Sequence, residues 1–183
     1  MILGRFFLFF VLLLLAGCSA VTSRVDTQPT VNATPSSKDE LYKIIDHEET
    51  TNGIPKGLLH SMAAVESQNA PYAVNAHRRA HRFKSKKAAA EFVNASVRRG
   101  CQNISVGCLQ LHYKTHRRHF ASIEDMLTPE RNVSYAAALL CALYRKYGSW
   151  EQAVKMYHSR RGKLNKAYYA KVMQKQRLFV KQS

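Results

Sequence analysis

The 183-residue chain carries 28 lysine and arginine residues against 12 acidic ones, which gives a formal net charge of +16. Its length allows one domain with a leader and a linker, and excludes a chain of several large domains. So basic a chain should associate with polyanions, but no nucleic-acid-binding motif surrounds its scattered basic pairs, and we expect no nucleic-acid partner.

The first 17 residues predict a signal peptide. Arg5 is the only charge, and the apolar run at 6–16 is too short for a transmembrane helix. The run ends in Leu15-Ala16-Gly17-Cys18, which resembles the bacterial lipoprotein signal, where the chain is cut before a cysteine that is then acylated. The alternative is an ordinary secretory signal with a chance cysteine. Several acyl chains on Cys18 would anchor the protein firmly, and Ser19, in place of an inner-membrane retention Asp, favours the outer membrane.

Residues 18–36 comprise this cysteine and a segment rich in Ser, Thr, Pro and Asn, the composition of a flexible linker. We expect the folded domain to span 37–183. If Cys18 is acylated, three thiols remain in an oxidising compartment, Cys101, Cys108 and Cys141. They allow at most one internal disulfide, and the sequence does not indicate which pair would form it.

The domain should begin with a helix, because Ser37-Lys38-Asp39-Glu40 forms a capping box and apolar residues follow at helical spacing. Thr51-Asn52-Gly53 should end this helix. Pro55 should open the next one, since proline is tolerated in a first helical turn. Glu66 follows Leu59 by seven residues and Met62 by four, so it lies on the apolar face of that second helix.

The remaining chain predicts further helices. One lies within the basic, Ala-rich segment 77–100 and ends at Gly100, and a short loop at 102–106 follows. Others are expected at about 132–147, 150–159 and 164–180 from their apolar spacing. No alternating run is long enough to indicate a strand of ordinary length. We therefore predict a mainly α domain built around the buried helix that carries Glu66.

Four segments resemble the motifs of lytic transglycosylases with a lysozyme-like domain of the goose-type lysozyme or SLT class. They are Val65-Glu66-Ser67, Gly107-Cys108-Leu109-Gln110-Leu111, Asn132-Val133-Ser134-Tyr135-Ala136-Ala137 and Met156-Tyr157-His158-Ser159-Arg160. All four occur in order across residues 40–175. The resemblance implies a lysozyme-like helical fold, a catalytic Glu66 and peptidoglycan glycan strands as the substrate.

The chain departs from the commonest members of this family. The gap between the first two motifs is longer, and His158 and Arg160 stand where the family has Asn and Gly. These features resemble a subgroup with a long insertion, an Ile-Asp-Val-Gly-Cys-Met-Gln segment and a Tyr-His-Ser motif. Ser105 replaces the acid of that segment here, and we assign it no role.

The acids also bear on the chemistry. A carboxyl group on an apolar face is kept protonated by burial and can deliver a proton to a glycosidic oxygen. Hydrolases usually add a second carboxylate, but the only acid between Glu66 and Glu124 is Glu91, within the predicted insertion helix. A single-Glu mechanism fits best. In the family the sugar's own 6-hydroxyl then closes a 1,6-anhydro ring, without water or a cofactor.

The resemblance implies roles for further residues. Ser67 either hydrogen-bonds the substrate or is a polar residue at a helix end. Gln110 should orient a sugar hydroxyl or acetamido group, and Tyr157 should act near Glu66 as an oriented donor. His158 can both donate and accept, as the amide it replaces does.

Three positions look mainly structural. Gly107 and Leu109 belong to the second motif, and Asn132 is expected to cap its own helix.

Two other kinds of site remain in view. His112, His116 and His119 have the spacing of metal ligands on one helix face, but no Cys or carboxylate completes the set and basic neighbours would repel a cation, so we expect no metal. Cys108 paired with a histidine could be a thiol nucleophile, although it lies within the glycan-cleaving motif.

Other functions also stay open, namely a hydrolytic muramidase on the same fold or a non-catalytic peptidoglycan-binding lipoprotein of an envelope-spanning machine. The process is open too: wall turnover, division, or local clearing for a secretion or conjugation apparatus.

Overall fold

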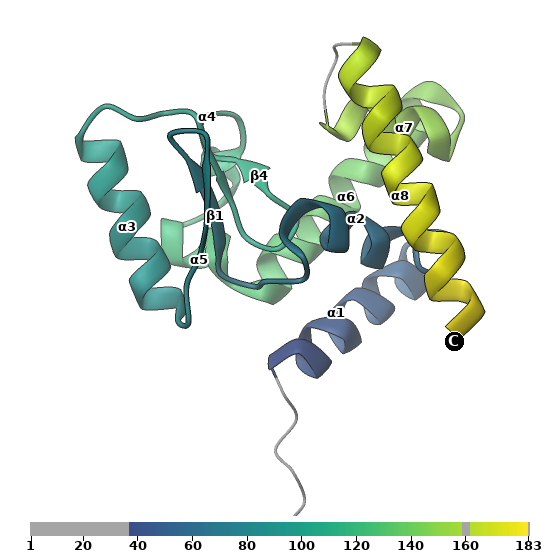
Figure 1. The fold of residues 1–183 in the computed structure, drawn as a ribbon, viewed down its shortest axis with the longest axis horizontal. Helices are drawn as coiled ribbons and strands as arrows, with labels where there is room; N and C mark the ends of the chain where they lie inside the picture. The colour runs from purple at the N-terminus through teal and green to yellow at the C-terminus, as the bar shows by residue number, and fades with distance from the viewer. Residues whose placement is uncertain (1–36, 159–161, 183) are drawn as a thin grey trace, which may run out of the picture. The chain divides into compact units, whose positions relative to one another are not determined.

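The structure, a computed structural model, describes residues 37–158 and 162–182 (Figure 1). The predicted signal peptide, Cys18 and the linker lie outside the described residues, as do Ser159 and Arg160 of the fourth motif. Within the described ranges, no helix combines the length and the apolar character needed to cross a membrane.

The fold is mostly helical, as predicted. Its elements are α1 (Ser37–Thr51), α2 (Leu58–Ser67), α3 (Lys86–Arg98), α4 (Tyr113–His116), a short 3-10 turn (Arg117–His119), α5 (Ile123–Leu127), α6 (Pro129–Tyr147), α7 (Trp150–His158) and α8 (Gly162–Gln182). The prediction that Pro55 opens α2 was wrong, because Gly57 has a left-handed φ of 75° and the helix begins only after it. Side-chain caps from Ser85 and Ser122 begin α3 and α5.

A small antiparallel sheet was not predicted. Its strands are β1 (Ala73–Ala76), β2 (Arg79–Arg82), β3 (Ile104–Val106) and β4 (Leu111–His112), in the order β2-β1-β3-β4. These strands are too short for an alternating apolar and polar pattern to be detected in the sequence. The β1–β2 turn consists of His77 and Arg78, both at positive φ, where Asn-Gly or Asp-Gly would have signalled a hairpin.

Helix α2 lies at the centre of the domain. Its residues Leu59, Met62 and Ala63 are fully buried, and both α1 and α8 pack on it. Figure 1 shows the sheet, α3 and α5 on one side of α2, with α7 and α8 on the other. Glu66 lies near the end of α2, and residues of the sheet strands and of α7 line the same pocket.

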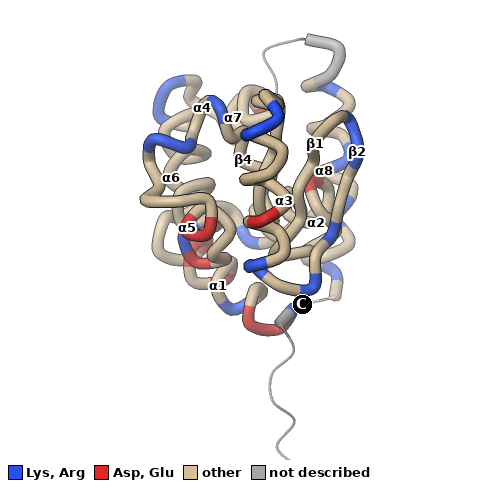
Figure 2. Tube along the Cα trace, turned by 90° about the vertical axis from the view of Figure 1, so that its left-hand side faces the viewer, with Lys and Arg blue, Asp and Glu red and all other residues tan. Residues whose placement is uncertain are grey.

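Basic residues are spread widely over the described chain. In the view of Figure 2, Lys and Arg occupy separate short segments, including β2 and the region of α4, and do not form one continuous stripe. This distribution matches the scattered basic pairs in the sequence.

Candidate active site

The end of α2 presents Glu66 to a pocket. Glu66 is the penultimate residue of the helix, and its side chain is 13% exposed. Gln68 follows in the left-handed conformation with φ of 60°, which stops the helix there. The buried residues of α2 fix the helix in the core, and the helix in turn positions Glu66 at the pocket.

This pocket, of about 330 Å³, brings together four of the predicted site residues: Glu66, Gln110, Tyr157 and His158. Its other lining residues come mainly from the sheet and the segment that follows it, and they are Asn75, Ser105, Leu111, His112, His116 and Leu139. Glu66 supplies the only carboxylate among these lining residues.

Ser67 lies elsewhere. Its buried hydroxyl donates to the carbonyl of Ala63 at 3.1 Å and accepts from the N–H of Ala70 at 3.2 Å. It is not among the pocket-lining residues. This placement supports the second of its two proposed roles, a polar residue that stabilises the helix end, over contact with a substrate.

Two groups from α7 lie against Glu66. The Nδ1 atom of His158 is 3.8 Å from Oε1 of Glu66. The hydroxyl of Tyr157 donates to the carbonyl oxygen of Leu109 at 2.8 Å, so its proton is already held, and the view of Tyr157 as a donor aimed at the reaction centre has to be revised. Burial, and then the charge of Glu66, raise the pKa of Tyr157 well above its ordinary value. The phenol therefore stays neutral.

Tyr168 of α8 is a further member of this cluster that the sequence did not reveal. Its hydroxyl is buried beside the Glu66 carboxyl without a hydrogen bond of good geometry, and burial and the charge of Glu66 raise its pKa well above the ordinary value. The ring stacks flat on His158, with centroids 4.2 Å apart and 5° between planes. In the sequence Tyr168 looks like an ordinary core residue of α8, because it shares a helix face with buried Asn165 and Val172.

Gly107 and Asn132 form a structural pair behind the pocket. Gly107 has φ of 83°, and a Cβ there would lie 2.1 Å from Nδ2 of Asn132. The expectation that Asn132 caps its own helix was wrong, because α6 begins earlier, at Pro129, with Thr128 as the N-cap. The fully buried amide instead accepts from the N–H of Leu109 at 3.0 Å and donates to the carbonyls of Val106 and Met126, both at 3.0 Å.

This pair positions the residues of the second motif. Leu109 is fully buried, and its carbonyl receives the Tyr157 hydroxyl. Gln110 then adopts a left-handed φ of 49°, and its amide donates to the carbonyl of Gly107 at 2.8 Å. The Gln110 side chain is thereby held at the pocket wall, where a substrate group can meet it.

Comparison with known proteins agrees with this geometry. A family model described as "Transglycosylase SLT domain" matches residues 43–179. The chain belongs to this SLT transglycosylase family. The match begins in α1, ends in α8 and includes all four motifs, so the SLT domain accounts for the mostly helical, lysozyme-like fold. At the family level it supports lytic transglycosylase-type activity on peptidoglycan. No curated protein and no solved structure matched the chain.

The thiol and metal alternatives do not fit this SLT domain. Cys108 is fully buried, its Sγ contacts Oδ1 of Asn132 at 3.4 Å, and burial raises its pKa to about 12, which leaves too little thiolate for a nucleophile. Cys101, Cys108 and Cys141 are all free thiols. His112, His116 and His119 do not share one helix face, because His112 lies in β4 and His119 in the 3-10 turn.

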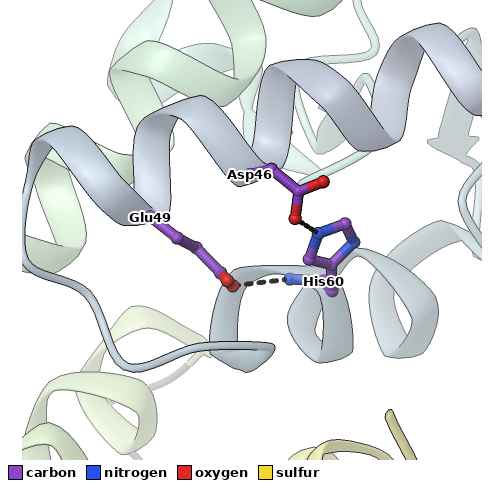
Figure 3. Close-up of side chains that lie close together, drawn as sticks. All are labelled: Asp46, Glu49 and His60. Atoms are coloured by element: carbon purple, nitrogen blue, oxygen red, sulfur yellow. Dashed lines mark hydrogen bonds and ion pairs between the residues drawn. The ribbon is translucent and has the colours of Figure 1, made fainter. Parts of the chain in front are cut away.

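Another cluster by α1 and α2 has the donor types of a metal site. Asp46 and Glu49 of α1 point toward His60 of α2 (Figure 3), and one ligand atom from each lies within 4.8 Å of the others. The carboxylate of Glu49, however, accepts from the N–H groups of Gly57, Leu59 and His60 at 2.7, 2.6 and 3.2 Å.

These N–H groups are the unpaired donors at the start of α2. Gly57, the N-cap residue, has no side chain to satisfy them. A metal ion would have to compete with them for Glu49, so we assign the cluster to anchoring the helix that carries Glu66. Burial raises the pKa of Glu49, and the Gly57 N–H and the charge of His60 act in the opposite direction.

Two substitutions separate the roles of the α7 residues in the SLT domain. Tyr157→Phe removes the hydroxyl that holds Leu109, and a shift of the neighbouring Gln110 should lower kcat/KM roughly 100-fold, as small misplacements in a site do. His158→Asn restores the residue commoner in the family and should be tolerated much better. Release of soluble fragments from purified peptidoglycan measures both. The reverse order would mean that the histidine has taken over chemistry in this protein.

Proposed function

We propose that this protein cleaves the β-1,4 bond between N-acetylmuramic acid and N-acetylglucosamine in peptidoglycan by non-hydrolytic transglycosylation, leaving 1,6-anhydromuramic acid ends. The observation that carries this proposal is the single carboxylate, Glu66, in a pocket otherwise lined by neutral polar groups, histidines and a few apolar side chains. A two-carboxylate hydrolase would need a partner acid at about 5–10 Å. None of the described lining residues supplies one.

The reaction then uses Glu66 twice. Protonated Glu66 gives its proton to the glycosidic oxygen as the bond to the anomeric carbon breaks. The resulting carboxylate takes the proton of the sugar's 6-hydroxyl, whose oxygen bonds to the anomeric carbon and closes the anhydro ring. The proton count balances, and Glu66 is protonated again. Burial raises the pKa of Tyr157 and of Tyr168, so both phenols keep their own protons and neither can take up the proton of the 6-hydroxyl.

A hydrolytic muramidase is the second candidate, and the position of His158 is the observation that favours it. An imidazole 3.8 Å from the Glu66 carboxyl could accept a proton from an attacking water. Mass spectrometry of digested cell walls separates the two reactions. Anhydro ends support transglycosylation, and reducing ends that have gained a water support hydrolysis. Absence of any cleavage would favour the third candidate, a binding lipoprotein without catalytic activity.

We also propose that acylated Cys18 anchors the enzyme in the cell envelope, on the outer membrane if the source is Gram-negative. The support is the Leu15-Ala16-Gly17-Cys18 sequence after an apolar run, followed by Ser19. Cys18→Ala should remove the lipid and shift the protein from the detergent phase to the aqueous phase, because the acyl chains supply the membrane affinity. A Cys101→Ala variant is the matched control. Unchanged partitioning of Cys18→Ala would contradict the lipoprotein assignment.

A further inference from the structure

The histidines that follow the second motif have no role in the proposed reaction, yet two of them, His112 and His116, line the Glu66 pocket. His116 is the better placed to bind a ligand. His112 has both ring nitrogens near side-chain oxygens, with Nδ1 3.0 Å from Oγ1 of Thr115 and Nε2 3.3 Å from Oδ1 of Asn103. His116 has only Nδ1 engaged, 3.0 Å from the hydroxyl of Tyr135.

The surroundings of His116 determine where its proton lies. Burial, followed by electrostatic interactions with His112, His119 and Arg118, lowers the pKa of His116, so the ring is neutral at pH 7. Burial raises the pKa of Tyr135, so the phenol keeps its proton. A phenol donates more readily than it accepts, and an imidazole nitrogen is a strong acceptor. Tyr135 therefore donates to Nδ1, and the ring proton of His116 is on Nε2.

The Nε2–H group of His116 is left for a ligand. Among the described residues, the hydrogen bond of His116 is the one between Nδ1 and Tyr135. The buried polar atoms without a partner in the described chain are His60 Nδ1, Asn69 Oδ1 and the Tyr168 hydroxyl. Nε2 of His116 is not one of them, so this unbonded nitrogen is accessible from outside the protein. His116, with its ring oriented by Tyr135, lines the same pocket as Glu66.

We propose that His116 is a substrate-binding residue, whose Nε2–H donates a hydrogen bond to the acetamido carbonyl oxygen of an N-acetylated sugar in the Glu66 pocket. This inference rests on the proposed function and extends it to a residue outside the four family motifs. A neutral N–H group suits a neutral carbonyl, and every sugar of the proposed substrate carries an acetamido group. Tyr135 is a positioning residue, because it acts through the ring of His116.

Binding to a defined glycan tests the proposal without turnover. The probe is the pentamer of N-acetylglucosamine, titrated into the Glu66→Gln protein by calorimetry. A double variant that combines Glu66→Gln with His116→Phe keeps an aromatic ring but removes the donor. It should bind the pentamer about fivefold to tenfold more weakly, as expected from the loss of one hydrogen bond. Adding His116→Gln instead should restore most of the affinity, because the glutamine amide can place an N–H group near the position of Nε2.

His119 supplies the matched control. It packs against the same Tyr135 ring, with centroids 5.2 Å apart, but it is exposed and outside the pocket. Adding His119→Phe should leave the affinity unchanged. Equal binding by the Glu66→Gln parent and its His116→Phe derivative would overturn the inference and leave the proposed function intact. No binding by the parent would contradict the assignment of the pocket to an N-acetylated glycan, and the inference with it.

Peptidoglycan strands serve as a second probe. They carry two kinds of carbonyl group, the acetamido group and the lactyl group of muramic acid, and comparison with the pentamer distinguishes between them. The N-acetylglucosamine pentamer carries acetamido groups and no lactyl group, so an effect of His116→Phe on this probe supports the acetamido assignment. An effect confined to peptidoglycan strands would overturn it in favour of the lactyl group.

Discussion

Replacing Glu66 with glutamine is expected to leave the domain folded and to lower peptidoglycan cleavage by roughly 1,000-fold or more, within the range that general acid–base catalysis contributes. Glutamine keeps the shape of the side chain but can neither deliver a proton to the glycosidic oxygen nor take one from the 6-hydroxyl. The side chain is only 13% exposed, so replacing the acid by a neutral amide should preserve or slightly raise the melting temperature.

The measurement is the release of soluble fragments from purified peptidoglycan, with thermal unfolding recorded on the same samples. Glu91→Gln is the matched control, because Glu91 is an exposed acid of α3 that does not line the pocket. It should retain full activity. If Glu66→Gln kept most of the wild-type rate, Glu66 would not be the acid, and both reaction schemes above would be untenable.

Asn132→Ala is expected to have the largest effect on stability. It leaves the N–H of Leu109 and the carbonyls of Val106 and Met126 without their partner in a fully buried place. Each unsatisfied buried group costs about 1–3 kcal/mol, and a total loss of about 4 kcal/mol should lower the melting temperature by roughly 10 °C. The loop that carries Gln110 should loosen as well. Activity should therefore be reduced even at temperatures below the melting transition, where the domain is still folded.

Thermal unfolding followed by circular dichroism measures this change. Asn103→Ala is the matched control, since Asn103 is exposed and its side-chain oxygen lies 3.3 Å from Nε2 of His112, an exposed hydrogen bond. A melting temperature for Asn132→Ala within about 2 °C of the wild type, equivalent to less than about 1 kcal/mol, would show that other contacts hold the loop.

Much of the fold was predictable because helices repeat locally. Apolar spacing, with a capping box at Ser37, placed α1, α6, α7 and α8 close to their observed bounds, and the same spacing put Glu66 on the buried face of α2. For α3 the prediction gave only the end near Gly100, because the first part of the segment 77–100 forms β2 and the helix begins at Lys86. The short strands were not predicted, because a strand of two to four residues is too short to show an alternating pattern. In addition, the β1–β2 turn consists of His77 and Arg78, which are not typical hairpin residues.

The composition of the site depended on contacts between segments far apart in the chain. The motifs named Glu66, Gln110, Tyr157 and His158, and the pocket does bring these four together. Only the tertiary structure decided that Asn132 holds the Gly107 loop, that Ser67 bonds to backbone groups and that Tyr168 lies beside Glu66. The physical reason is that a residue's helical face follows from its neighbours in sequence, whereas its partners across the core follow from how the elements pack.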